Sequence, residues 1–230
     1  LEEKSINESS TGKVFNMINN LKSIGTKVLN LAIGEPKWYP KLSNYKLENY
    51  GSDYSTSKGE LKLINKLIDT FHEKSLISDI STENVMITSG AKLGLYITLK
   101  YLTKPGSKWI IPKPYWVSYP DMIDSLEGES IFVDTKVENN WEPDLDELWK
   151  INVSNYEFNN IKGIIICYPN NPTGLSYSDK FIDGLISLVV KKKIYLIIDE
   201  VYLMVDGSLK SLYTKIKDND LLSNYLIIVS

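Results

Sequence analysis

Short apolar segments alternate with segments of helical period along most of the chain, and this alternation limits the folds open to it. Helical spacing of apolar residues occurs at 13–24, 61–71, 91–102 and 181–190. The apolar segments are VMIT at 85–88, WII at 109–111, SIFV at 130–133, GIIIC at 163–167, YLII at 195–198 and YLIIV at 225–229. Repeated strand–helix–strand order is typical of an α/β protein, and wholly apolar strands fit a sheet covered on both faces. We therefore predict a three-layer α/β sandwich built on a mainly parallel sheet.

The first 40 residues differ from this alternating body. A helical segment at 13–24 and the extended sequence VLNLAI at 28–33 precede the first strand–helix repeat. We predict that residues 1–40 form an N-terminal arm belonging to a smaller domain, and that residues 41–230 form a large domain.

Composition argues against several classes of protein. A net charge of −3 gives the chain no electrostatic bias toward nucleic acid or an anionic membrane. The single cysteine (Cys167) and the single histidine (His72) argue against a disulfide framework and a metal cluster. No apolar segment approaches the roughly 20 residues that span a bilayer, and the polar start LEEKSINESS is unlike a secretory signal. We expect a cytoplasmic protein without a metal site.

Residues that follow the strands are the first candidates for a site, because open parallel sheets bind ligands at the carboxyl ends of their strands. Gly90, Ala91 and Lys92 follow the segment 85–88 and begin a helix, where free N–H groups favour an anion. After 109–111, Trp116 follows a proline turn and is placed to stack on a planar ligand. The simpler interpretations are an ordinary turn and a tryptophan packed in the core.

Two further strand ends carry polar side chains. In YPNNPTG (168–174), two prolines and a glycine restrict the backbone around Asn171, which is then able to offer a directed hydrogen bond. A turn without a ligand is the alternative. Asp199 and Tyr202 follow the apolar strand at 195–198. Buried acids are rare unless paired, so Asp199 indicates either a cationic partner or a helix cap.

In their order along the chain, these segments resemble the class I and II aminotransferases, which are pyridoxal-phosphate enzymes of fold type I. The segments cover nearly the whole chain, and the distance from NPTG to DEVY is the most specific feature. The matching segments are LAIGEP (31–36), YSTSKGELKLI (54–64), TSGAK (88–92), PKPYWVSYP (112–120), YPNNPTG (168–174) and IIDEVY (197–202).

The resemblance implies how pyridoxal 5'-phosphate would be held. Backbone N–H groups of Gly90, Ala91 and Lys92 would bind the phosphate, and Trp116 would stack on the pyridine ring. Asn171 would hydrogen-bond the phenolate oxygen of the ring, together with Tyr202. Trp116 and Asn171 would also line the substrate site.

The resemblance assigns the chemistry to Asp199 and Tyr202. Asp199 would pair with the pyridine nitrogen, because a protonated ring accepts electrons better than a neutral one, and a carboxylate raises the pKa of a nearby cation by ~1–3 units. Gly34 would contact the substrate carboxylate. Tyr54 would reach the phosphate of the neighbouring subunit in a homodimer. For Gly34 and Tyr54 the alternatives are a plain turn residue and an exposed loop residue.

The lysine that binds the cofactor covalently would follow the strand at 225–229, and the sequence stops at Ser230. Either the sequence is a segment of a longer enzyme, which the missing initiator methionine favours, or it is a short protein for which this covalent chemistry is impossible.

We predict an aminotransferase of amino-acid metabolism that moves an amino group between an amino acid and a 2-oxo acid. One alternative is a pyridoxal-phosphate-dependent lyase acting by elimination or cyclisation on the same fold. Another is a non-catalytic binding or scaffolding chain. Aspartate, aromatic and alanine-type amino donors all fit the sequence.

Overall fold

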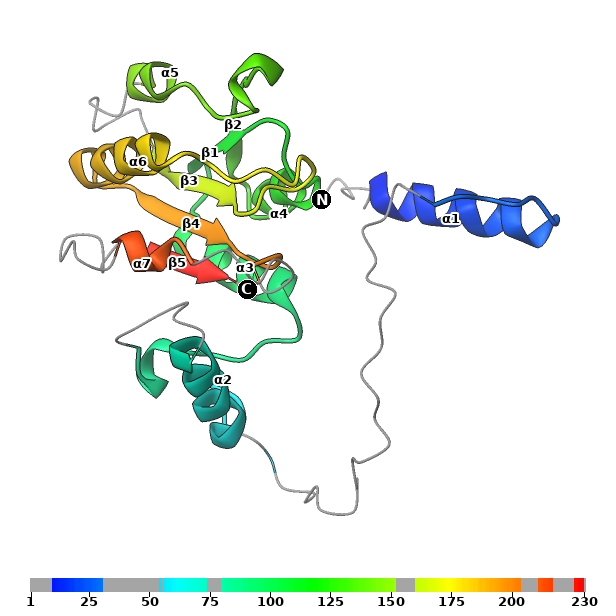
Figure 1. Ribbon diagram of the computed structural model, residues 1–230, viewed down its shortest axis with the longest axis horizontal. Helices are drawn as coiled ribbons and strands as arrows, with labels where there is room; N and C mark the ends of the chain where they lie inside the picture. The colour runs from blue at the N-terminus through cyan, green and yellow to red at the C-terminus, as the bar shows by residue number, and fades with distance from the viewer. Residues whose placement is uncertain are drawn as a thin grey trace. The chain divides into compact units, whose positions relative to one another are not determined.

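The computed structural model of the 230-residue chain describes residues 10–30, 54, 56–73, 80–151, 160–203, 211–216 and 226–229. The chain divides into two compact units, residues 1–54 and 55–230. In the first unit the described helix is α1 (Ser10–Ser23), drawn in blue in Figure 1. The predicted arm over residues 1–40 stays a prediction.

Five strands form the sheet of the second unit. In chain order they are β1 (Lys108–Pro112), β2 (Glu129–Val133), β3 (Ile161–Cys167), β4 (Tyr195–Asp199) and β5 (Leu226–Val229). Their order across the sheet is β2-β1-β3-β4-β5, and each of the four pairings is parallel (Figure 1). The order changes direction between β1 and β3, and ligands of such sheets bind outside the carboxyl ends of the strands at this reversal.

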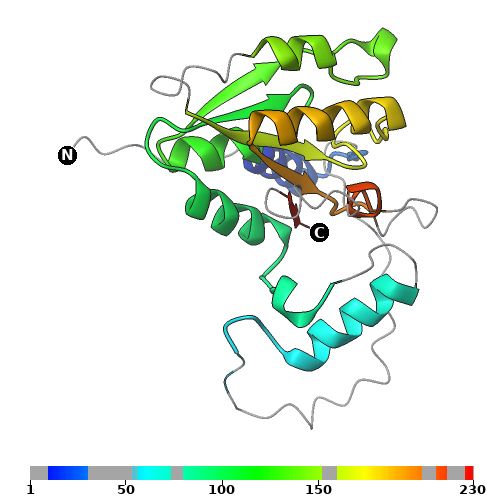
Figure 2. The ribbon, with the colours of Figure 1, turned by 90° about the vertical axis from the view of Figure 1, so that its left-hand side faces the viewer.

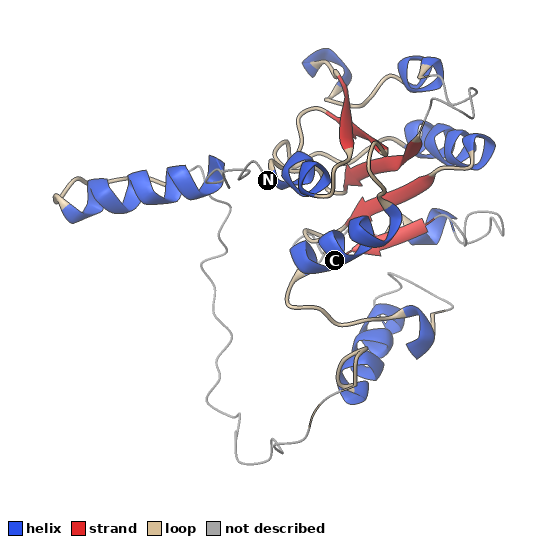
Figure 3. Cartoon of the chain, turned by 180° about the vertical axis from the view of Figure 1, so that it is seen from behind, coloured by secondary structure: helices blue, strands red, loops and turns tan. Residues whose placement is uncertain are grey.

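Helices cover both faces of the sheet, as Figures 2 and 3 show. One face carries α3 (Ala91–Leu102) and α4 (Ser118–Ser125), and the other carries α5 (Leu145–Lys150), α6 (Asp179–Lys192) and α7 (Tyr213–Ile216). The unit also contains α2 (Leu61–Glu73) and the 3-10 turns η2 (Thr82–Asn84) and η3 (Val137–Asn139). The predicted three-layer sandwich is confirmed. None of the helices in the described ranges is long and apolar enough to cross a bilayer.

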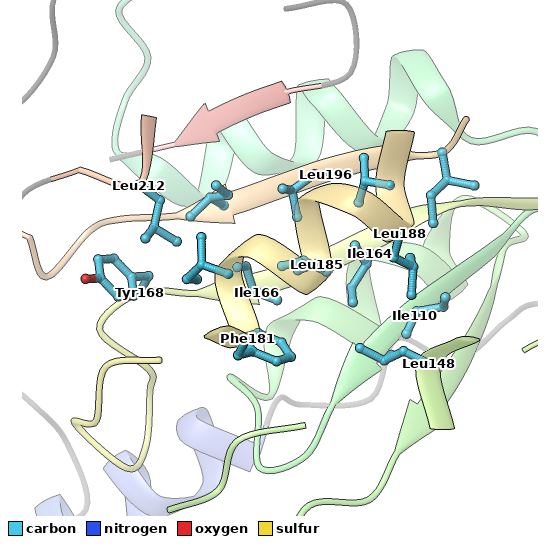
Figure 4. Packing of buried hydrophobic residues seen from close by; sticks show 14 of the residues in the cluster. Ile110, Leu148, Ile164, Ile166, Tyr168, Phe181, Leu185, Leu188, Leu196 and Leu212 are labelled. Atoms are coloured by element: carbon cyan, nitrogen blue, oxygen red, sulfur yellow. The ribbon is translucent and has the colours of Figure 1, made fainter. Parts of the chain in front are cut away.

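Side chains along the central strands alternate between two hydrophobic clusters. On one face, Ile164, Ile166 and Leu196 pack against Phe181 and Leu185 of α6 (Figure 4). The opposite cluster contains the alternate strand residues and the buried faces of α3 and α4. Its buried members are Leu95, Leu99, Leu102, Trp109, Ile111, Tyr119, Met122, Ile123, Ile165 and Ile197. Because successive side chains of a strand point to opposite faces, the residue after Ile198 in β4 points to the α3–α4 face, and that residue is Asp199.

Local sequence sets the ends of α6. Ser178 caps its N-terminus by accepting a hydrogen bond from the Phe181 N–H at 3.1 Å. Lys191 and Lys192 lie in the last turn, where cations interact favourably with the helix dipole, and Lys193 ends the helix in the left-handed conformation with φ 53°.

The prediction of a strand at residues 85–88 is wrong. These residues have no regular structure, although five of the six predicted strands match β1 to β5. The N–H of Ile87 donates to the carbonyl of Lys58 at 2.8 Å, and the side chain of Met86 is 51% exposed. An apolar segment becomes a strand only where a neighbouring strand offers ladder hydrogen bonds, and the apolar pattern carries no information about that neighbour. The extended segment predicted at 28–33 shows no strand at residues 28–30, and the remainder lies outside the described residues.

Gly163 on β3 has no room for a side chain. A Cβ atom there would lie 2.3 Å from the carbonyl oxygen of Tyr195 on β4 and 2.7 Å from the Trp109 ring. We expect Gly163→Ala to lower the free energy of unfolding by ~1–3 kcal/mol, because the backbone of β4 must move. Urea unfolding measures this change. The control Lys162→Ala removes a partly exposed side chain one residue away and should change stability by under about 0.5 kcal/mol. Equal losses in the two variants would contradict the steric explanation.

Candidate active site

The first turn of α3 holds backbone N–H donors that no helical carbonyl accepts, whereas the predicted donor Gly90 N–H already bonds to the Thr88 carbonyl at 2.8 Å. Gly90 is the N-cap residue, with φ 84° and ψ 161°, and no side chain caps the helix. A Cβ atom on Gly90 would meet no atom within 4 Å. Ala91 and Lys92 lie in the first turn, where backbone N–H groups have no acceptor within the helix. Together with the helix dipole, these donors favour an anion at this place.

The side chain of Lys92 connects the start of α3 to the loop after β1. Its Nζ donates to Ser118 Oγ at 3.2 Å and lies 5.4 Å from the centre of the Trp116 ring. Trp116 is partly buried and meets Tyr119 edge to face, with ring centres 5.4 Å apart and planes at 87°. The predicted phosphate-binding residues and the predicted stacking residue are therefore neighbours in the structure.

Asp199 lies at the end of β4 in an apolar environment. It is 3% exposed, and its Oδ2 accepts a hydrogen bond from the Tyr119 hydroxyl at 2.8 Å. Its Oδ1 accepts a bond from the Val201 N–H at 3.2 Å, and because residues 201–203 form a turn, this contact is not the helix cap considered above as the alternative. Within the part of the chain that the structure describes, no cation pairs with this carboxyl group.

Burial determines the ionisation of Asp199. Loss of solvation raises the pKa of its carboxyl group above the ordinary value, and the hydrogen bonds from Tyr119 and Val201 act in the opposite direction. A buried carboxylate without a cationic partner is costly to keep ionised. The site is therefore suited to a ligand that brings a positive charge to Asp199.

Two protonated side chains flank Asp199. Cys167 is paired with it in the register of β3 and β4, and the thiol donates to the Pro169 carbonyl at 3.2 Å. Burial, followed by the nearby charge of Asp199, raises the pKa of the Cys167 thiol to about 12. The same causes raise the pKa of Tyr119 far above its usual range. Both groups stay protonated at neutral pH, and Cys167 packs as a buried core residue.

Asn171 and Tyr202 form a hydrogen-bonded pair. The amide Nδ2 of Asn171 donates to the Tyr202 hydroxyl at 3.0 Å, and both side chains are partly buried. The loop that carries Asn171 is held by Asn170, whose Nδ2 donates to the Pro114 carbonyl at 3.4 Å and to Thr173 Oγ1 at 3.1 Å. The structure thus brings together Asn171 and Tyr202, the two residues that the family resemblance assigns to the phenolate oxygen of the cofactor.

Glu200 is buried beside Asp199 and has other partners. It is 1% exposed, and its Oε1 accepts a bond from the Leu212 N–H at 2.7 Å, while its Oε2 has no hydrogen-bond partner among the described residues. The bond from Leu212 joins the turn after β4 to the start of α7. Burial raises the pKa of Glu200 to about 7, while the bonds from Ser211 and Leu212 act in the opposite direction.

Gly34 and Tyr54 were also predicted to belong to the site. Tyr54 is fully exposed and belongs to the first compact unit, and Gly34 lies outside the described residues. Conversely, sequence analysis did not identify Tyr119. Its signal was the spacing of three between Trp116 and Tyr119, which places both on one side of a helical turn. Across the described ranges, no group of three or more His, Cys, Asp or Glu side chains is arranged to hold a metal ion.

Comparisons with known proteins all find similarity to aminotransferases. The sequence profile of the family "Aminotransferase class I and II" matches residues 26–228. The aspartate aminotransferase of Thermotoga maritima is 34% identical over 186 residues, which are 77% of this chain and 47% of that protein. The asparagine–oxo-acid transaminase of Streptococcus mutans is 28% identical over 187 residues, with 79% and 46% covered. The chain spans about half the length of the curated relatives it matches.

Solved structures are similar over most of this chain. The aspartate aminotransferase of Thermus thermophilus with maleate matches with a TM-score of 0.83 and 25% identity, over 98% of this chain and 58% of that one. The aspartate aminotransferase of Thermotoga maritima matches with a TM-score of 0.75 and 30% identity, over 90% and 56%.

Glu200 makes stability depend on pH. Its folded-state pKa of about 7 exceeds the ordinary value of 4.5, so the folded protein binds more protons than the unfolded chain between these values. The stability from this group is fully present below about pH 4.5 and is lost as the pH rises through about 7. We expect Glu200→Gln to flatten the decline in unfolding free energy between about pH 5 and about pH 7.5, measured by urea unfolding.

Glu83→Gln is the matched control for this prediction. Glu83 is exposed, and its ion pair with Lys58 lowers rather than raises its pKa. This substitution should therefore leave the slope above about pH 5.5 unchanged. A wild-type slope in Glu200→Gln would contradict the assignment to Glu200.

Proposed function

Because the chain belongs to the class I and II aminotransferases, we propose that it acts in a pyridoxal-phosphate-dependent enzyme that moves an amino group from an amino acid to a 2-oxo acid. The observation that carries this proposal is the Asp199 carboxyl group, which is 3% exposed and has no cationic partner among the described residues. A cationic ring nitrogen is the partner that this group lacks.

The residues around Asp199 fit the other groups of the cofactor. The first turn of α3 offers backbone donors for a phosphate, and the Lys92 ammonium adds positive charge beside it. Trp116 offers an aromatic face for a planar ring, and Asn171 and Tyr202 offer hydrogen bonds for a phenolate oxygen. The phosphate, the ring, the ring nitrogen and the phenolate oxygen of pyridoxal 5'-phosphate thus each have a chemically suitable partner at the carboxyl ends of the strands.

When bound, the cofactor supplies an electron sink for the substrate carbon that carries the amino group. The role of Asp199 is to hold a proton at the ring nitrogen, since a nearby carboxylate raises the pKa of a cation by ~1–3 units, at about 1.4 kcal/mol each. Tyr202, oriented by the hydrogen bond from Asn171, would donate a hydrogen bond to the phenolate oxygen. The apolar side chains of the α3–α4 face exclude water and so strengthen these electrostatic interactions.

We extend the proposal to the residues and partners that the sequence resemblance implies. Gly34 contacts the substrate carboxylate, and Tyr54 reaches the phosphate site of the second subunit of a homodimer. The enzyme works in the cytoplasm. Aspartate is the amino donor to test first, because two of the similar proteins are named aspartate aminotransferases.

A half-reaction tests the proposed chemistry. Incubation of the protein and pyridoxal phosphate with aspartate should give pyridoxamine phosphate and oxaloacetate in equal amounts, separated by chromatography. Aromatic amino acids and alanine serve as alternative donors in parallel incubations. Ammonia released with no pyridoxamine phosphate would instead indicate a lyase, and no binding of pyridoxal phosphate would favour a non-catalytic chain.

The charge of Asp199 is tested by Asp199→Asn, which keeps the size of the side chain. We expect kcat/KM to fall at least about 100-fold, or ~2.7 kcal/mol, because the ring nitrogen loses the carboxylate that holds its proton. The control is Asp183→Asn on the exposed side of α6, which should retain wild-type kinetics. Wild-type kinetics in Asp199→Asn would refute the role of the charge.

A further inference from the structure

Tyr119 is a buried residue to which the proposed chemistry assigns no role. It lies in the first turn of α4, is 1% exposed, and donates its hydroxyl hydrogen bond to Asp199 Oδ2 at 2.8 Å. The two residues are 80 positions apart in the sequence and come from elements that are not neighbours in the sheet, because β3 lies between β1 and β4. A contact of this kind requires the complete fold around it.

Tyr119 also contacts a second residue assigned to the cofactor ring. Its ring meets Trp116 edge to face at 5.4 Å, and its backbone N–H donates to the Trp116 carbonyl at 3.1 Å. The remainder of the ring packs in the hydrophobic cluster that contains Met122 and Ile197. The hydroxyl group therefore has a fixed position between the loop after β1 and the end of β4.

We propose that Tyr119 is a positioning residue for amino-group transfer, and that its hydroxyl fixes the Asp199 carboxylate in one orientation toward the ring nitrogen of the cofactor. The proposal rests on the function proposed above. A carboxylate group has a broad range of orientations about its terminal torsion. In this structure each oxygen has its own donor, Tyr119 on Oδ2 and Val201 on Oδ1, and the two bonds together remove that freedom.

The same bond favours the ionised form of Asp199. Burial opposes ionisation, and the hydrogen bond from Tyr119 is the larger of the two opposing contributions. The other titratable groups near Asp199 are Cys167 from β3 and, in the turn after β4, Glu200 and Tyr202. Cys167 stays protonated, and a charged Glu200 would repel Asp199. Among these neighbours in the described residues, Tyr119 is the side chain that donates to the carboxylate.

Tyr119→Phe removes the hydroxyl and keeps the ring. The first measurement uses the protein without cofactor, labelled with 13C at its aspartate carboxyl groups, and follows the Asp199 signal by NMR as the pH changes. Asp199→Asn identifies that signal by its disappearance. We expect the midpoint of the Asp199 titration to rise by about 1–2 pH units in Tyr119→Phe, because hydrogen bonds to charged groups contribute that much.

The second measurement uses the protein with cofactor. We expect the Kd for pyridoxal phosphate to rise at least about 10-fold in Tyr119→Phe, and kcat to fall about 10- to 100-fold while KM for the amino acid changes less than about 3-fold. This division between kcat and KM is expected of a residue that acts through Asp199 and touches no substrate.

Tyr177→Phe is the matched control for both measurements. This tyrosine is partly buried, and its ring stacks on Tyr168 and meets Phe181 at a tilt of 43° at the α6 face of the sheet. It should leave the Asp199 midpoint, the Kd and the kinetics as in the wild type. Thermal melting of both variants verifies that they fold.

The outcomes separate this proposal from the proposed function. An Asp199 midpoint that does not move in folded Tyr119→Phe overturns the positioning role, whether or not the cofactor binds. A shifted midpoint with unchanged kcat also overturns it. A wild-type protein that binds no pyridoxal phosphate overturns the proposed function, even where the Asp199 midpoint shifts.

Discussion

The burial of the Asp199 carboxyl group is the constraint on which the arrangement of this site depends. Its side chain leaves β4 on the α3–α4 face, where its neighbours are apolar and water is excluded. Loss of solvation destabilises the carboxylate, and the fold provides one donor for each oxygen in partial compensation, from Tyr119 and Val201. The carboxylate still lacks a cationic partner, and a cofactor with a protonated ring nitrogen would supply one.

The order of the strands explains why the site forms at this position. The order reverses between β1 and β3, so the loops that follow these strands diverge and leave space at their carboxyl ends. Trp116 comes from the first of these loops and Asn171 from the second, and Asp199 ends the next strand. Gly163 leaves room for β3 and β4 to approach closely, in the register that pairs Cys167 with Asp199.

Two adjacent acids serve different purposes because successive residues of an extended chain point in opposite directions. Asp199 points toward Tyr119 and the site. Glu200 instead accepts a hydrogen bond from the Leu212 N–H just before α7, and so fixes the turn that carries Tyr202. Burial raises the pKa of both carboxyl groups, and the difference between them lies in their partners. In the proposed function Asp199 pairs with the ligand, and Glu200 stabilises the backbone around it.

The sequence by itself determined the layers of the fold and the residue types at the strand ends, because burial on one or both faces leaves a periodic pattern that is local. Periodicity predicted the helices α1, α2, α3 and α6 and five strands, and the order of the motifs predicted the family. Periodicity failed at 85–88, where a strand would have needed a partner that no local pattern specifies. Only the tertiary structure decided that Tyr119 meets Asp199. Their contact depends on the order and register of strands distant in sequence, and hydrophobic spacing encodes neither.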